Sequence, residues 1–230
     1  MGKSAEYQVP FRIRLFRTLM RPVFRGLFHL LSRVEISGLE NIPKQGAYLI
    51  AINHVSLYEP PFVLAFWSVA PEAVGAVDIW QRRGQSLLAR LYGGIPVHRG
   101  EYDRKLIERM QAALQSGRPL LIAPEGGRSH RPGMRRALPG VAYVLEKCPV
   151  PVVPVGITGA TDDFLRLALR CKRPLLKMQI GKPIMLPNEP ARGEARRDIR
   201  QRHADMIMQH IARLVPPEYR GVYVDDVAEL

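Results

Sequence analysis

The segment YLIAINHVSLYEPP, residues 48–61, decides the fold. Residues 48–52 are apolar and have the length of a strand buried on both faces. The polar residues Asn53 and His54 then leave this strand. Two prolines, at positions 60 and 61, suit the first turn of a helix whose N-terminus lies near Glu59. A buried strand that turns directly into a helix is typical of parallel α/β sheets.

Similar apolar runs lie on both sides of this segment and alternate with longer helical patterns. We expect strands at residues 34–37, 48–52, 73–77, 95–97, 120–123, 152–157 and 177–180. We expect helices at residues 61–69, 81–91, 102–116, 134–147 and 192–214. The alternation predicts one α/β domain over residues 34–230, with a mostly parallel central sheet flanked by helices.

Residues 10–33 have the pattern of a basic amphipathic helix, which Pro22 is expected to kink or divide. Cations recur at spacings of three and four along one stripe: Arg14, Arg17, Arg21 and Arg25. A broad face of Phe and Leu side chains lies beside the stripe. Such a helix suits an anionic membrane interface, where each Arg contributes roughly 1 kcal/mol. We therefore predict that residues 1–33 form a membrane-interface region; the alternative is a terminal helix that packs on the domain.

Charge and cysteine content narrow the function classes. The chain has 230 residues, with 34 Lys and Arg against 21 Asp and Glu, and a net charge of +13. This balance predicts an anionic partner: nucleic acid, a phosphate-bearing substrate or an anionic membrane surface. No run of about 18 apolar residues predicts a membrane-spanning helix, and no continuous apolar segment near the N-terminus predicts a secretory signal. Two cysteines, Cys148 and Cys171, are too few for a disulfide framework or a zinc cluster and favour a reducing compartment.

His54 and Glu59 are the first candidates for chemistry, because they lie on a loop between a strand and a helix. A carboxylate five residues after a histidine can fold back and orient the imidazole. Such a pair can deprotonate a hydroxyl group. The alternative is a histidine that caps the loop and a glutamate that caps the helix.

Two further loops follow predicted strands. In PEGGRS, residues 124–129, the glycines let the backbone approach a ligand and Arg128 offers a planar fork to a phosphate. In GGIPVHR, residues 93–99, Arg99 follows a short strand and is a further candidate. The alternative interpretation of this loop is a tight turn with a surface arginine. Together the three loops predict a pocket at one edge of the sheet.

These three loops and VVPV, residues 152–155, resemble in order the four sequence blocks of the glycerolipid acyltransferases. Within that superfamily the chain is similar to the bacterial 1-acyl-sn-glycerol-3-phosphate acyltransferases. The resemblance spans roughly residues 34–184. Two positions depart from the family pattern: Glu59 stands where the family has aspartate, and Gly127 stands where it has threonine.

The resemblance implies transfer of a fatty acyl group from acyl-CoA or acyl carrier protein to the free hydroxyl of 1-acyl-sn-glycerol 3-phosphate, which forms phosphatidic acid. It implies no metal and no cofactor beyond the thioester co-substrate. His54 is expected to be the general base, oriented by Glu59. Arg99 and Arg128 are expected to hold the acceptor's phosphate. Glu125 is expected to orient an arginine or the acceptor glycerol, and N–H groups near Gly126 to stabilise the oxyanion.

Some interpretations stay open. Cations at Arg131, Arg135 and Arg136 fit the phosphates of coenzyme A, an acidic carrier protein or simply a solvated loop. The acceptor could instead be glycerol 3-phosphate, another lysophospholipid or a lyso-aminolipid. A non-enzymatic membrane- or nucleic-acid-binding protein is a distant alternative, and nucleic acid is not an expected partner because no nucleic-acid-binding motif is visible. The expected location is the cytoplasmic face of the inner membrane, as a peripheral or monotopic protein. No role is expected for His98 or His130.

Overall fold

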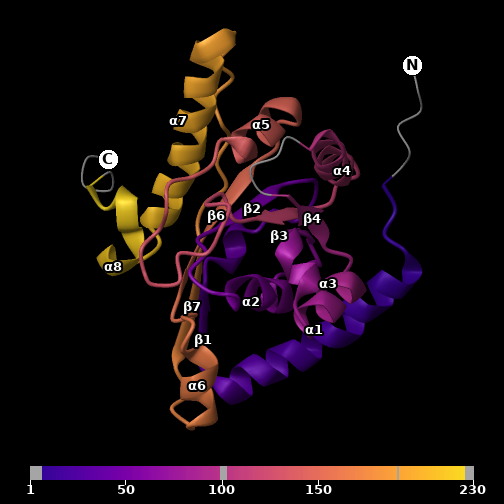
Figure 1. Ribbon diagram of the computed structural model, residues 1–230, viewed down its shortest axis with the longest axis vertical. Helices are drawn as coiled ribbons and strands as arrows, with labels where there is room; N and C mark the ends of the chain where they lie inside the picture. Colours follow the sequence, from indigo (N-terminus) through magenta and orange to yellow (C-terminus); the bar gives the residue numbers. More distant parts are fainter. Residues whose placement is uncertain (1–6, 99–102, 191, 226–230) are drawn as a thin grey trace.

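The computed structural model describes residues 7–98, 103–190 and 192–225. Within these residues, seven strands form one sheet in the order β1-β7-β6-β2-β5-β3-β4 (Figure 1). Neighbouring strands are parallel except β6 and β7, which are antiparallel. The strands are β1 (Arg33–Ser37), β2 (Leu49–Ile52), β3 (Glu72–Ala76), β4 (Ile95–Val97), β5 (Leu120–Ile122), β6 (Val152–Thr158) and β7 (Leu175–Ile180). The predicted α/β domain with a mostly parallel sheet is confirmed.

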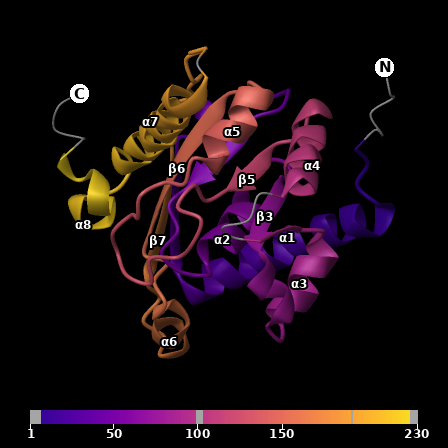
Figure 2. The same cartoon turned by 45° about the horizontal axis from the view of Figure 1, so that its top comes forward.

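Helices cover both faces of this sheet. The α-helices are α1 (Phe11–Leu31), α2 (Glu59–Phe66), α3 (Gln85–Tyr92), α4 (Arg104–Gln115), α5 (Gly140–Lys147), α6 (Phe164–Leu169), α7 (Gly193–Ala212) and α8 (Pro217–Arg220). Three short 3-10 helices are η1 (Leu39–Asn41), η2 (Val77–Gln81) and η3 (Gly221–Tyr223). Helices α4, α5 and α7 lie on one side of the sheet, and α1, α2 and α3 lie on the other (Figure 2).

The sheet separates two apolar cores. All four residues of β2 are buried. Leu49 and Ala51 pack in the core beneath α4, α5 and α7, whereas Ile50 and Ile52 pack in the core beneath α1, α2 and α6. Alternate residues of a strand point to opposite faces, so a strand between two helical layers must be apolar throughout. This requirement explains the uninterrupted apolar run of residues 48–52.

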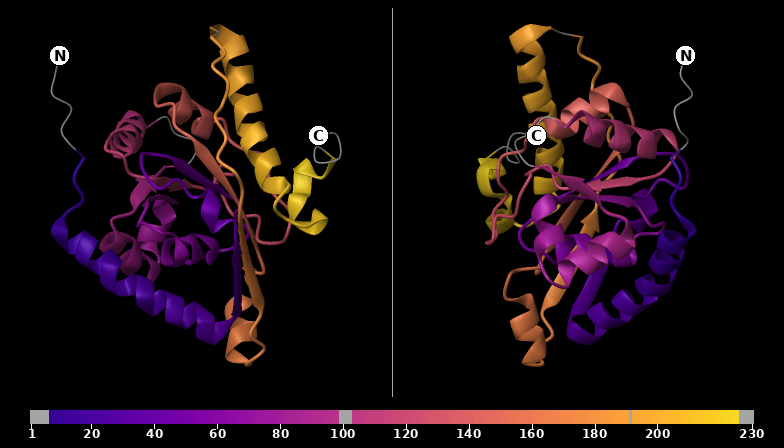
Figure 3. Two further views of the ribbon diagram at one scale, coloured as in Figure 1. Left: turned by 180° about the vertical axis from the view of Figure 1, so that it is seen from behind. Right: turned by 45° about the vertical axis from the view of Figure 1, so that its right-hand side comes forward.

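Helix α1 packs on the domain through its basic stripe, on the side of the sheet opposite α7 (Figure 3). Arg17 is only 3% exposed. Its two terminal nitrogens donate to the Glu72 carboxylate at 2.7 and 2.8 Å, and its Nε donates to the Tyr92 carbonyl oxygen at 2.9 Å. Arg118 donates to the same carboxylate at 2.7 Å. A buried carboxylate thus holds the middle of the stripe against the sheet.

The next two arginines of the stripe meet the C-terminal end of α2. Arg21 donates to the carbonyl oxygens of Trp67 and Ser68, and Arg25 donates to that of Ala65 at 2.6 Å. The last carbonyls of a helix have no partner within the helix and attract cations. The prediction that the stripe faces an anionic membrane is therefore wrong for Arg17, Arg21 and Arg25.

The opposite face of α1 is exposed and rich in apolar side chains, although Arg12, Thr18 and His29 are also exposed. Its large exposed apolar side chains are Phe11, Leu15, Leu19, Val23, Leu27 and Leu30. The helix is continuous through Pro22, so the expected division at this residue is wrong. At the seam with α3, Gly93 has a φ of 76°, and a Cβ there would lie 2.7 Å from Cδ1 of Ile13. None of the helices described here is long and apolar enough to span a bilayer.

Two further predictions of local structure need correction. The helix expected over residues 134–147 begins at Gly140. The residues before Gly140 are not helical, because their N–H groups bond to distant parts of the chain. Met134 N–H donates to the Tyr219 oxygen at 3.0 Å, and Leu138 N–H donates to the Pro124 oxygen at 2.9 Å. The short helices α6 and α8 were not expected, since each is too short to show a helical period.

Candidate active site

The candidate site lies where β2 and β5 end. These strands are parallel neighbours, so the loops that leave them meet at one edge of the sheet. Asn53 fixes the first loop, because its side-chain amide donates to the Ile157 oxygen at 2.8 Å and accepts from the Ile157 nitrogen at 2.7 Å. The next residue, His54, therefore leaves β2 from a position tied to β6.

His54 and Glu59 lie in contact. The distance from His54 Nδ1 to Glu59 Oε2 is 3.2 Å. Glu59 is the first residue of α2 and is fully buried. Its carboxylate accepts N–H bonds from Ser56 at 2.9 and 3.0 Å and from Val55 at 3.2 Å. Glutamate, in place of the family's aspartate, thus reaches the imidazole by folding back from the start of the helix.

Glu125, which was expected to orient an arginine or the acceptor glycerol, accepts two main-chain N–H groups in the structure. One carboxylate oxygen accepts the N–H of His54 at 2.7 Å and the other accepts the N–H of Arg135 at 2.7 Å. The side chain is buried. Burial raises the pKa of this carboxyl to about 7, although the two N–H groups favour its charged form. Glu125 therefore joins the His54 loop to the segment that precedes α5.

The loop after Glu125 holds the His54 loop from its other side. Ser129 N–H donates to the His54 oxygen at 2.9 Å, and His130 N–H donates to the Val55 oxygen at 2.9 Å. The φ of Gly126 is 65°, and a Cβ there would lie 2.3 Å from Leu138 Cδ1. A side chain at this position would therefore displace the Leu138 side chain and would need a left-handed backbone conformation that favours glycine.

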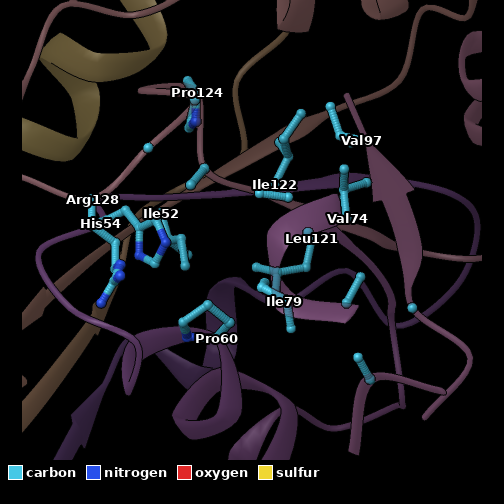
Figure 4. A pocket seen from close by; sticks show the side chains of 18 of the residues that line it. Ile52, His54, Pro60, Val74, Ile79, Val97, Leu121, Ile122, Pro124 and Arg128 are labelled. Atoms are coloured by element: carbon cyan, nitrogen blue, oxygen red, sulfur yellow. The ribbon is translucent and has the colours of Figure 1, made fainter. Parts of the chain in front are cut away.

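Arg128 lies beside His54 on the wall of a cavity (Figure 4). Its guanidinium is 18% exposed and lies 3.9 Å from Oδ1 of Asp162. Gly126 also lines the cavity, but its own N–H donates to the Ala123 oxygen at 3.1 Å and is not free for an oxyanion. Arg99, predicted to hold phosphate, lies outside the described residues.

Sequence reasoning missed a second histidine–carboxylate pair. His130 Nδ1 lies 2.9 Å from Oδ2 of Asp162, and His130 also lines the cavity. The two side chains are 58% and 45% exposed. They are 32 residues apart in the chain, so no spacing could have predicted the contact. Among the cations of this loop, Arg136 meets Asp205 at 3.4 Å, and Arg131 is exposed.

The cavity has a volume of about 1190 Å³ and is mostly apolar. Side chains of α1, α2, α3, α4 and α5 and of strands β2, β3 and β5 form its wall. His54 and Arg128 lie together at one edge of it (Figure 4). The arrangement can therefore place a hydrocarbon chain, a hydroxyl group and an anion close to one imidazole. No cluster of metal-ligating side chains occurs within the described ranges.

A family model described as acyltransferase matches residues 33–158, more than half of the chain. The chain belongs to the acyltransferase family. This acyltransferase is 29% identical over 159 residues to an uncharacterized protein of Mycobacterium tuberculosis and to one of Mycobacterium bovis. These matches cover 64% of the chain and 43% of each relative, so the chain spans less than half the length of the curated relatives.

A solved structure extends the likeness to the fold. The acyltransferase is similar to the crystal structure of the 1-acyl-sn-glycerophosphate (LPA) acyltransferase PlsC from Thermotoga maritima, with a TM-score of 0.60 and 20% identity. The match covers 89% of this chain and 83% of PlsC. At this identity the comparison shows a shared fold. The residues that carried the resemblance in the sequence lie inside the matched family region, and His54, Glu59, Gly126 and Arg128 meet at one place in it.

Proposed function

We propose that this acyltransferase moves a fatty acyl group from acyl-CoA or acyl carrier protein to the free hydroxyl of 1-acyl-sn-glycerol 3-phosphate, and so forms phosphatidic acid. The observation that carries the proposal is His54, held by a buried carboxylate, beside Arg128 at the edge of a large apolar cavity. The Thermotoga maritima protein of similar fold is a 1-acyl-sn-glycerophosphate acyltransferase, which supports this choice of substrate.

His54 would act through Nε2, because Nδ1 faces Glu59. Nε2 takes the proton of the acceptor hydroxyl while the hydroxyl oxygen attacks the thioester carbonyl. A C–O bond forms, the C–S bond breaks, and the leaving sulfur receives the proton from His54. The Glu59 carboxylate stabilises the imidazolium between these two steps. N–H groups of the residues after Gly126 are the candidate donors to the oxyanion, since that of Gly126 is already bonded.

The acceptor would be held at both of its ends. Arg128 offers a forked donor to its phosphate, next to the imidazole that receives the hydroxyl proton. The apolar wall removes hydrocarbon from water, worth about 0.8 kcal/mol for each buried methylene. The thioester's carrier, whether coenzyme A or a carrier protein, would meet the cations near Arg135.

We also propose that the protein works at the cytoplasmic face of the inner membrane, with the apolar outer face of α1 against lipid. Exposed side chains of α3 extend this face: Leu87, Leu88 and Leu91. Replacing Leu15, Leu19 and Leu27 together by serine should abolish sedimentation with vesicles of anionic phospholipid. The matched control replaces Leu39 and Val222, which are exposed elsewhere. Equal sedimentation of the two variants would refute the assignment of this face.

The activity itself is tested with purified protein, lysophosphatidic acid and a long-chain acyl thioester. Release of one free thiol for each phosphatidic acid formed is the expected result. A panel that adds glycerol 3-phosphate, other lysophospholipids and lyso-aminolipids ranks the acceptors. Failure with every donor and acceptor would refute the proposed reaction, whereas a better acceptor than lysophosphatidic acid would replace the substrate and keep the chemistry.

A further inference from the structure

The cavity continues from one face of the sheet to the other. Some of its lining residues belong to the core beneath α1 and α2: Phe24, Ile52, Leu64, Ala65 and Leu121. Others belong to the core beneath α4 and α5: Val74, Leu106, Ile107, Met110, Ile122 and Val144. We name these two parts the α2 chamber and the α4 chamber.

The two chambers meet at the strand ends that carry the candidate site. On β5, Leu121 lines the α2 chamber and the next residue, Ile122, lines the α4 chamber, since successive residues point to opposite faces. Figure 4 shows Ile122 and Val97 above Leu121, Ile79 and Pro60, with His54 and Arg128 to one side. An imidazole at this junction is within reach of groups that come from either face.

The sequence keeps room on the α2 side. Gly75 of β3 lies one strand period from Ala73, which packs on the α2 side, and a Cβ on Gly75 would lie 3.1 Å from Cδ1 of Ile79 and 3.5 Å from Trp80. The volume of about 1190 Å³ exceeds the roughly 300–1,000 Å³ of common ligand pockets. A single acyl chain would fill only part of a cavity that has this volume and extends over both faces of the sheet.

We propose that the two chambers hold two hydrocarbon chains at once: the acceptor's own chain in the α2 chamber and the chain being transferred in the α4 chamber. The inference rests on the proposed function and names its substrate class, an acceptor that already carries an acyl chain. Glycerol 3-phosphate would leave the α2 chamber empty and is therefore expected to be a poor acceptor.

Charge assigns the chambers. Next to the α4 chamber the wall includes Arg135 and Arg197, which suit the phosphates or acidic side chains of a thioester carrier, and Arg200, which Glu146 holds at 2.6 Å. The wall next to the α2 chamber also contains two arginines, Arg17 and Arg21, but Glu72 and the carbonyl groups after α2 hold them within the domain. The rest of that wall includes the apolar side chains of Phe16, Met20 and Phe24 of α1. A lipid acceptor would come from that side.

A matched pair of substitutions tests the assignment. Leu64 of α2 and Ile107 of α4 are both half-buried aliphatic residues of the cavity wall. Leu64→Trp should narrow the α2 chamber and Ile107→Trp the α4 chamber. For each variant, kcat/KM is measured over a series of donor chain lengths with one acceptor and over a series of acceptor chain lengths with one donor.

We expect Leu64→Trp to shorten the preferred acceptor chain and leave the donor profile unchanged, and Ile107→Trp to do the reverse. Each methylene that loses its burial should lower kcat/KM about fourfold. Leu64→Ala and Ile107→Ala provide the opposite test, because a wider chamber should lengthen the preferred chain, and they avoid overpacking the core.

Three results would overturn the inference: both Trp variants changing only the donor profile, the two effects appearing exchanged, or wild-type protein accepting glycerol 3-phosphate as well as a lysophospholipid. These results all require an active enzyme. Absence of transfer by the wild type with every donor and acceptor would instead refute the proposed function, so the two failures are distinguishable.

Discussion

The histidines of two histidine–carboxylate pairs line the same cavity, and the pairs differ in their surroundings more than in their geometry. His54 and Glu59 are separated by 3.2 Å, and His130 and Asp162 by 2.9 Å. The shorter contact is the more exposed one, at 58% and 45%, whereas the His54 ring is 15% exposed and Glu59 is buried. Distance alone would favour His130 and Asp162, whereas burial favours His54 and Glu59.

The difference lies in what else each carboxylate does. Glu59 accepts N–H bonds from Val55 and Ser56, which fix the angle at which its carboxylate meets the imidazole. Asp162 also faces the Arg128 guanidinium at 3.9 Å. A half-exposed carboxylate that is shared between a guanidinium and an imidazole orients neither of them firmly. We therefore expect catalysis to depend on the buried pair.

Replacing His54 gives the largest expected effect. His54→Ala removes the proposed general base and should lower kcat by about 10²–10⁴-fold. The matched control is His130→Ala, on the same cavity wall. Steady-state rates of thiol release compare the two, with circular dichroism to check the fold. An equal loss of kcat in both variants would contradict the expectation that catalysis depends on His54 and not on His130.

Replacing the buried carboxylate should come next. Glu59→Gln keeps the side chain's shape but removes the charge that fixes the tautomer of His54, and it should lower kcat by roughly 10²–10³-fold. Asp162→Asn makes the same chemical change at the exposed pair. If KM for the acceptor rises in the Asp162 variant while kcat falls only in the Glu59 variant, the exposed pair serves binding and the buried pair serves the chemical step.

Glu125 supports only the first pair, so its substitution should have an intermediate effect. In Glu125→Gln the amide NH₂ faces one main-chain N–H, and one of the two loops loses its bond; we expect a loss of about tenfold in kcat with little change in KM. Glu108→Gln, at the exposed surface of α4, is the control. A higher KM with an unchanged kcat would instead indicate that Glu125 contacts the substrate.

The raised pKa of Glu125, about 7 against an ordinary value of 4.5, adds a pH signature. The folded protein binds this proton more tightly, so Glu125 makes the fold less stable as pH rises from about 4.5 to 7, by at most about 3 kcal/mol. Activity should rise over the same pH range, because a protonated Glu125 accepts one of its two main-chain N–H groups less well. The free energy of unfolding in urea and kcat are both measured across this pH range in the wild type and in Glu125→Gln. We expect the variant to lose this pH dependence of both quantities.

The smallest effect is expected at the exposed pair. His130→Ala leaves the His54–Glu59 contact and both N–H bonds of the loop in place, because His130 donates to Val55 through its backbone. Its kcat should remain within about threefold of wild type. A loss similar to that of His54→Ala would break the comparison and place His130 in the reaction.

Local patterns predicted the fold well, and distant contacts limited the rest. The seven strands lie close to their predicted positions, because apolar runs between turn residues are strong local signals. The contact between His54 and Glu59 was also predictable, since five residues and a helix start separate them. The bond from His54 to Glu125 joins residues 71 positions apart, and no spacing indicates it.

Helix α1 shows why a correctly predicted helix can be given the wrong partner for one of its faces. Periodicity predicted the basic stripe and the apolar face beside it, and the stripe was expected to meet an anionic membrane. The choice depends on Glu72 and the end of α2, which only the folded chain brings to Arg17, Arg21 and Arg25. Partners, and not the side chain's own polarity, decide which stripe is buried.

The position of α1 also bears on how quickly a substrate chain arrives. One face of this helix lines the cavity and the other carries exposed leucines, so one helix diameter, about 10 Å, separates the two apolar regions. A hydrocarbon tail that travelled between them through water would lose about 0.8 kcal/mol per methylene on the way. At the seam between α1 and α3, Ile13 packs so closely on Gly93 that a Cβ there would lie 2.7 Å from Cδ1 of Ile13. We therefore expect a larger residue at position 93 to push α1 away from α3 and to change the rate of loading more than the equilibrium affinity.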